Sequence, residues 1–172
     1  MNTPPSVGVT VTFIRPDNTT AYTAGDAVGA SGLNGALLEF ADIANWMNPG
    51  REVCIISARL RIDIDAVPVG MDKFRLHLYN VAPDSLWADN GAWDLASASD
   101  RAGYLGFIEF ATPADLGSTL FVQLDDIQHQ VSMLPPSSTS PNNTLYAMLQ
   151  TVGAWTPAAL TQFAVTLNTE AK

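Results

Sequence analysis

The sequence predicts an all-β protein, an antiparallel, jelly-roll-like β-sandwich with one or two short helices in its loops. Residues 53–65, VCIISARLRIDID, alternate apolar and polar side chains with a period of two, as a strand with one buried face does. Several shorter alternating segments follow, and Pro and Gly punctuate the chain between them. Eight or so such strands joined by turns are typical of a two-sheet sandwich.

The first strands carry the clearest alternation. Within 7–14 the apolar side chains are Val7, Val9, Val11 and Phe13. Residues 36–46 fit either a helix or a strand followed by a turn. In 53–65 the expected buried side chains are Ile56, Ala58, Leu60, Ile62 and Ile64, and the expected exposed ones are Ser57, Arg59, Arg61 and Asp63. This one-sided exposure favours an antiparallel sheet.

The following strand repeats the pattern after a turn at 66–70. Its expected buried residues are Phe74, Leu76 and Leu78, and its expected exposed ones are Lys73, Arg75, His77 and Tyr79. A helical turn is predicted in 94–103, and Asp125-Asp126 is predicted to be a hairpin loop. The remaining predicted strands are 106–110, 119–124, 128–133, 145–152 and 162–167.

The length of 172 residues suits one domain, which we place at 7–172 behind a mobile arm at 1–6 containing Pro4 and Pro5. The first residues have no basic and apolar leader pattern, and no apolar run is long enough to cross a bilayer, so we expect synthesis in a cytoplasm and no membrane partner. Cys54 is the only cysteine, which excludes an intramolecular disulfide.

Recognisable catalytic and cofactor motifs are missing from the sequence, so we expect neither an enzyme nor a cofactor. The net charge of -9 argues against direct nucleic-acid binding. In the 84–94 loop, calcium ligation is one reading and a plain turn the other; the oxygen donors there are Asp84, Asp89, Asn90 and Asp94. The tryptophans either bind sugars at the surface or fill the core; they are Trp46, Trp87, Trp93 and Trp155.

Positive charge is concentrated in the middle of the chain, where six of the eight basic residues lie between Arg51 and Arg101. If the strands at 53–65 and 74–79 pair as a hairpin, one exposed face carries Arg59, Arg61, Lys73 and Arg75. Such a basic stripe is either a solvated face with local ion pairs or a docking surface for an acidic protein. With Pro4 and Pro5, these four residues are the candidate partner-binding residues.

Four segments resemble small structural proteins of tailed bacteriophages, of the capsid cement or decoration type. They are VTFIRPDNTTAYTAGDAVG (11–29), ISARLRIDIDAVPVGMDKFRLHLYN (56–80), APDSLWADNGAWDL (82–95) and DLGSTLFVQLDDIQHQV (115–131). The likeness lies in strands and turns and includes no catalytic motif. It implies a protein on the outer surface of the phage head that stabilises contacts between major capsid protein subunits. It also implies a homo-oligomer, a trimer or a dimer.

Two other roles fit the sequence. One is a tail or head-fibre component, which is still structural. The other is a carbohydrate-binding module displayed on the virion, and solvent-exposed tryptophans would distinguish it.

Overall fold

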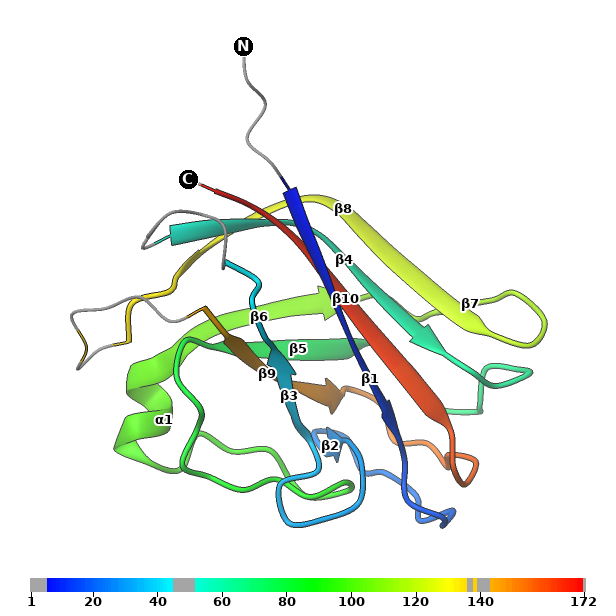
Figure 1. Ribbon diagram of the computed structural model, residues 1–172. Coiled ribbons are helices and arrows are strands. Elements are labelled where there is room, and N and C mark those ends of the chain that lie inside the picture. The colour runs from blue at the N-terminus through cyan, green and yellow to red at the C-terminus, as the bar shows by residue number, and fades with distance from the viewer. Residues whose placement is uncertain (1–5, 45–51, 136–137, 139–142, 172) are drawn as a thin grey trace.

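The described part of the chain forms a sandwich of two five-stranded antiparallel sheets with one short helix (Figure 1). The computed structural model describes residues 6–44, 52–135, 138 and 143–171. The elements are β1 (Ser6–Ile14), β2 (Ala27–Val28), β3 (Leu37–Phe40), β4 (Glu52–Ile62), β5 (Phe74–Tyr79), α1 (Ala98–Gly103), β6 (Tyr104–Phe110), β7 (Ala114–Asp115), β8 (Leu120–Ser132), β9 (Leu145–Thr151) and β10 (Gln162–Ala171).

The chain crosses between the two sheets in the manner of a jelly roll. One sheet has the order β1-β10-β4-β8-β7, and the other has the order β2-β9-β5-β6, with β3 also paired to β9. The strands nearest the two ends of the described chain are neighbours, because β10 lies between β1 and β4. This arrangement confirms the predicted antiparallel, jelly-roll-like sandwich.

The core lies between the sheets and is built from one face of each strand. Phe13 of β1 stacks on Phe163 of β10, with ring centroids 5.1 Å apart, and Phe74 of β5 meets Phe163 edge-on from the opposite sheet. The other large contributors are aliphatic side chains from β4, β5, β9 and β10 that have no exposed surface: Ile55, Leu60, Ile62, Leu76, Leu78, Leu149, Val165 and Leu167. Burial of these side chains holds the two layers together.

Most predicted strands are present, and the open choice at 36–46 resolves in favour of a strand. β1, β6, β9 and β10 match the predicted segments to within a few residues. Leu37–Phe40 is β3 and a turn follows it through residue 44, so the helical alternative is wrong for the described part of 36–46. The predicted helical turn is α1, which Ser97 and Asp100 begin with a reciprocal capping box.

The hairpin predicted at Asp125-Asp126 is wrong, because 120–132 is a single strand. β8 pairs with β4 along its whole length, and three β8 residues, 126 to 128, lie opposite Ile56 alone. Asp126 and Gln128 have φ values of 55° and 53°, which the bulge requires. The same irregularity turns Ile56 partly outward, whereas Ala58, Leu60 and Ile62 are buried as expected.

The predicted hairpin of the two long strands is also wrong. β4 and β5 belong to different sheets, so the 63–73 connection crosses from one layer to the other. The exposed face predicted for β5 is only partly exposed: Arg75 is half-buried, but His77 and Tyr79 are buried. A loop covers them, and local alternation cannot reveal such a loop. Ser6 belongs to β1, so the arm predicted at 1–6 cannot include it; residues 1–5 lie outside the described residues.

Candidate functional site

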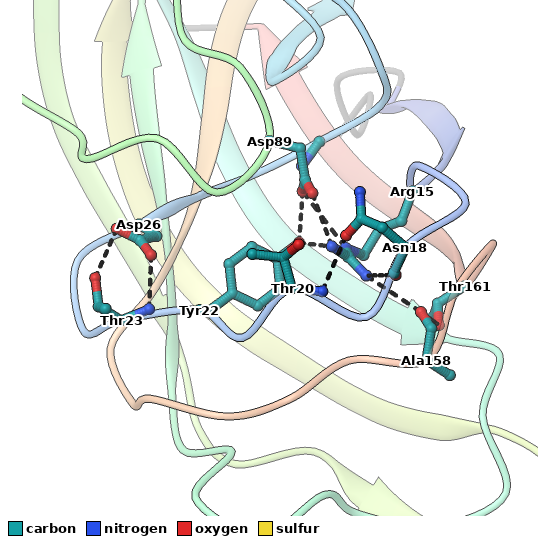
Figure 2. Close-up of polar contacts among 10 residues, drawn as sticks. Arg15, Asn18, Thr20, Tyr22, Thr23, Asp26, Asp89, Ala158 and Thr161 are labelled. Atoms are coloured by element: carbon teal, nitrogen blue, oxygen red, sulfur yellow. Dashed lines mark hydrogen bonds and ion pairs between the residues drawn. The ribbon is translucent and has the colours of Figure 1, made fainter.

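A buried polar cluster closes one end of the sandwich (Figure 2). Arg15 follows β1, and its Nη2 donates to Asp89 Oδ2 at 2.8 Å. Its Nε donates to Tyr22 Oη at 2.5 Å, and the Tyr22 hydroxyl donates to Asp89 Oδ1 at 2.5 Å. The backbone amide of Gly29 also donates to Asp89, and Arg15 Nη1 donates to the carbonyl of Ala158. The Arg15–Tyr22–Asp89 clamp therefore ties the connections on either side of β2 to the loop between β5 and α1 and to the connection between β9 and β10.

The clamp is almost fully removed from solvent. Arg15 is 1 % exposed and the Asp89 side chain 5 % exposed. Burial, with the Asp89 carboxylate beside it, raises the pKa of the Tyr22 hydroxyl far above its usual value, so this group stays a proton donor. All three polar side chains are saturated with partners inside the protein. The clamp is accordingly built to hold loops in place and leaves no group aimed at a ligand.

Asp89 lies in a loop that covers the outer side of the sheet β2-β9-β5-β6. The backbone of Trp87 accepts a hydrogen bond from Ala36, and Gly91 accepts one from Ala27. The Trp87 ring is buried against the outward side chains of β5 and β9 in a second small core of Ala27, Ala36, Tyr79, Trp87 and Met148. We call this outer side, beneath residues 84–95, the covered face.

His77 lies in the middle of the covered face. Its ring stacks on Trp93 with centroids 3.7 Å apart, and its two nitrogens are each 3.0 Å from a partner, Tyr104 Oη and Gln150 Oε1. Burial lowers the pKa of His77 to about 4, so the ring is neutral at ordinary pH. Its neutral form and full set of partners make it part of the packing.

The opposite outer side, on the sheet β1-β10-β4-β8-β7, has no such cover among the described residues, and we call it the bare face. One row across it runs from Thr10 of β1 through Thr166 and Arg59 to Gln123 of β8. Thr10, Arg59 and Gln123 are exposed, and Thr166 is half-buried. The side chains in this row are thus mainly neutral and polar.

The four predicted basic residues do not form one stripe. Arg59 and Arg61 lie on the bare face, and Arg75 lies on the outer side of the other sheet, two residues after Lys73. Lys73 Nζ and Arg75 Nε both bind Glu109, at 2.9 and 3.1 Å, and this contact lowers the pKa of Glu109. Arg61 pairs with Asp63 at 3.1 Å, and Arg59 forms no ion pair with a described residue. The stripe was wrong because it required β4 and β5 to pair.

The calcium and sugar readings of the sequence find little support in the geometry. Asp89 is engaged in the clamp and Asp84 binds Ser99, and the described residues contain no group of three or more His, Cys, Asp or Glu side chains placed to hold a metal ion. Trp87 and Trp155 are buried, and Trp93 is stacked on His77. Pro4, Pro5 and Trp46 lie outside the described residues.

The clamp was not predicted from the sequence. Arg15 follows a strand and precedes Pro16, a context in which an arginine is ordinarily exposed. The one signal was the reading of the tryptophans as core residues, two of which, Trp87 and Trp93, belong to the loop that contains Asp89. Trp87 confirms that reading. The described part of the chain also contains no helix long and apolar enough to cross a membrane.

The chain matches no protein-family model and no curated protein sequence. Among solved structures, it is similar to the heated full particle of Israeli acute paralysis virus, at 10 % identity over 97 % of this chain and 71 % of that one, with a TM-score of 0.33. It is also similar to Desmodium yellow mottle tymovirus (11 %, 99 % and 89 %, 0.29) and to Triatoma virus (10 %, 98 % and 64 %, 0.35).

Proposed function

We propose that this chain is a non-enzymatic structural protein of a tailed-phage virion, a cement or decoration protein on the outer surface of the head. The observation that carries the proposal is the resemblance of four segments to such proteins, together with where those segments lie. They make up β5, most of β4 and β8, the clamp loop and the covering loop, which are the parts that define this sandwich. Jelly rolls serve in viral capsids as well as in lectins and cupins.

The polar side chains that could take part in chemistry are hydrogen-bonded within the protein, which supports a structural role among the functions that jelly rolls serve. Asp89 and His77, the residues best suited to chemistry by type, are consumed by packing and hydrogen bonds. Asp100 likewise accepts from the backbone amides of Asp84 and Ser85 and caps α1. Their environment favours rigidity over reactivity. A protein that reinforces a shell needs this rigidity, because each loosely held loop would lose conformational entropy on binding.

The bare face is the side we propose to contact the major capsid protein. It is open, it is poor in charge, and Arg59 offers a cation with no ion-pair partner among the described residues. The complementary partner is an apolar or neutral polar surface with a carboxylate placed for Arg59, next to which Arg61 already pairs with Asp63. Lys73 and Arg75 are weaker candidates, since Glu109 already neutralises them.

The direct test is a heat challenge of phage heads assembled with and without this protein, read by release of DNA. We expect decorated heads to withstand a higher temperature. A cryo-electron microscopy map of the particle gives the location, and density for this chain in the tail or a head fibre would replace the proposal with that alternative. Equal thermal resistance of the two kinds of head would end the stabilising role.

The docking face is tested by charge reversal on either side of the sandwich. Arg59→Glu with Arg61→Glu changes the bare face, and Lys73→Glu with Arg75→Glu is the matched control on the other sheet. We expect the first pair to abolish co-sedimentation with undecorated heads and the second to leave it nearly unchanged. Circular dichroism verifies folding of both variants. Binding by the first pair at the unaltered level would contradict docking through the bare face.

A further inference from the structure

The described edges of the two sheets differ in how well they are protected against pairing with another chain. β7 and β2 have two residues each, and β3 has four and includes Glu39. β6 carries Glu109 and a glycine with φ 93° at 106. β8, which β7 covers at only one end, is kinked by its bulge and exposes Asp125 and Asp126. Short length, charge and bulges are the usual means of blunting a sheet edge.

β1 has none of these protections. It is nine residues long, SVGVTVTFI, without a charge or a proline, and six of its residues are β-branched. Its register with β10 is unbroken over nine pairs, so the strand is regular from end to end. Its opposite edge makes no backbone hydrogen bond to any described residue. A long, uncharged strand with an open row of amides and carbonyls is a template for another strand.

We infer that the open edge of β1 is where two copies of this chain pair, antiparallel and across a two-fold axis, so that two five-stranded sheets become one continuous sheet. This names the surface of the self-association expected above. It does not depend on binding to a phage head, so either idea can fail alone.

The sequence of β1 is self-complementary in that arrangement. With Thr10 opposite its own copy, Val9 faces Val11 of the second copy and Val7 faces its Phe13. The valines and Phe13 of both copies then stay on the core side, and the threonines, Gly8 and the exposed Ile14 stay on the bare face. A two-fold interface requires this match of a patch with itself.

Charge also favours a second copy at this edge. Each copy carries a net charge of -9, so two copies repel except where they meet through neutral residues. Thr10 is neutral, and its neighbour Thr166, whose hydroxyl is 2.8 Å away, is neutral as well. Along β1 and the exposed side of β10, the first acidic residue is Glu170, which lies opposite Ser6.

The test is sedimentation of the full chain and of variants at Thr10, which is exposed and lies at the proposed axis. We expect the unaltered chain to sediment as a multimer and both Thr10→Lys and Thr10→Glu to sediment as monomers, because each places two like charges face to face. Mixing the two variants should restore the multimer, a rescue that misfolded chains would not give. Gln123→Lys, exposed in the same row of the bare face, is the matched control and should stay multimeric.

A Thr10→Cys variant gives a second, independent readout. Opposed residues of an antiparallel pair have Cα atoms within disulfide distance, so oxidation should link two chains covalently. The natural thiol of Cys54 is buried, and the unaltered chain should remain unlinked under the same conditions. A monomeric unaltered chain, or multimers that survive Thr10→Lys, would overturn the inference. An unaltered chain that self-associates but does not bind phage heads would instead overturn the head-surface proposal.

Discussion

The two outer faces of the sandwich are used in opposite ways. On the covered face, the 84–95 loop buries Tyr79 and Met148 beneath Trp87 and His77 beneath Trp93, and the clamp fastens that loop through Asp89. On the bare face, Arg59, Thr10 and Gln123 remain exposed. The same alternation of residues along a strand thus leaves the outer face buried on one sheet and exposed on the other, because a loop covers only the first. One consequence is that substitutions on the covered face should affect stability, whereas those on the bare face should affect association.

The largest expected effect comes from removing the cover. Trp87→Ala deletes a buried ring that packs against β5 and β9, and we expect a loss of about 3–5 kcal/mol in the free energy of unfolding measured in urea. The matched aromatic on the bare face is Phe121, opposite Arg61 and half-buried. Its change to Ala should cost about 1 kcal/mol. Equal losses of unfolding free energy in Trp87→Ala and Phe121→Ala would contradict the proposed difference between the two faces.

The second-largest expected loss of stability comes from breaking the clamp. Asp89→Asn keeps the shape of the side chain but leaves the buried guanidinium of Arg15 without a counter-charge, and we expect a loss of about 3 kcal/mol. Asp63→Asn breaks the exposed pair with Arg61 and should change stability by roughly 0.5 kcal/mol or less. Urea denaturation compares the two variants, and a clamp variant as stable as the exposed one would show that the loop is held by packing alone.

His77 makes the covered face sensitive to acid. Its pKa is about 4 in the folded protein and near 6.5 when unfolded, so the unfolded chain takes up the proton first. Stability contributed by the neutral ring is therefore complete above about pH 6.5 and declines as the pH falls toward 4, by about 2 kcal/mol at pH 4.5. His77→Gln should flatten the difference in unfolding free energy between pH 7 and pH 4.5. A pH dependence of stability that His77→Gln leaves unchanged would contradict this role of the buried ring.

The smallest effect is expected where the rim of the covered face meets solvent. Glu109→Gln removes the partner of Lys73 and Arg75, whose ion pairs are exposed to water. We expect a slightly lower melting temperature at low salt and no difference at high salt, because salt screens exposed pairs. A melting temperature that stays lower at high salt would show that Glu109 stabilises the fold by more than screened ion pairs.

The sequence predicts what is local and misses what depends on distant pairing. Val7–Phe13 alternates in the sequence and in the structure, because one neighbouring sheet suffices to bury one face. The partner of β4 could not be predicted, since the turn at 66–70 fits a hairpin and a crossover equally well. The sequence at Asp125-Asp126 predicts a hairpin loop where the structure has a bulge within β8. A bulge and a hairpin loop both leave carboxylates exposed to water, so the sequence does not distinguish them.

The candidate surfaces were predicted only in part. The exposure of Arg59 and Arg61 followed from alternation, and it is correct. Their separation from Lys73 and Arg75 was missed, because it follows from sheet assignment. The burial of Arg15 and His77 was missed for a related reason: each is covered by segments more than ten residues away in the chain, and only the folded topology brings these together.

The position of β10 between β1 and β4 has a consequence for biosynthesis. β1 leaves the ribosome well before β10, its one strand partner among the described residues, which is made 156 residues later, counted from Thr10 to Thr166. At synthesis rates of about 5–20 residues per second, the wait is roughly 10–30 s. Throughout it, a strand without charge or proline has both of its edges unpaired. A polysome holds many nascent copies close together, so the feature that suits β1 for pairing in the finished protein also exposes nascent chains to premature contact with one another.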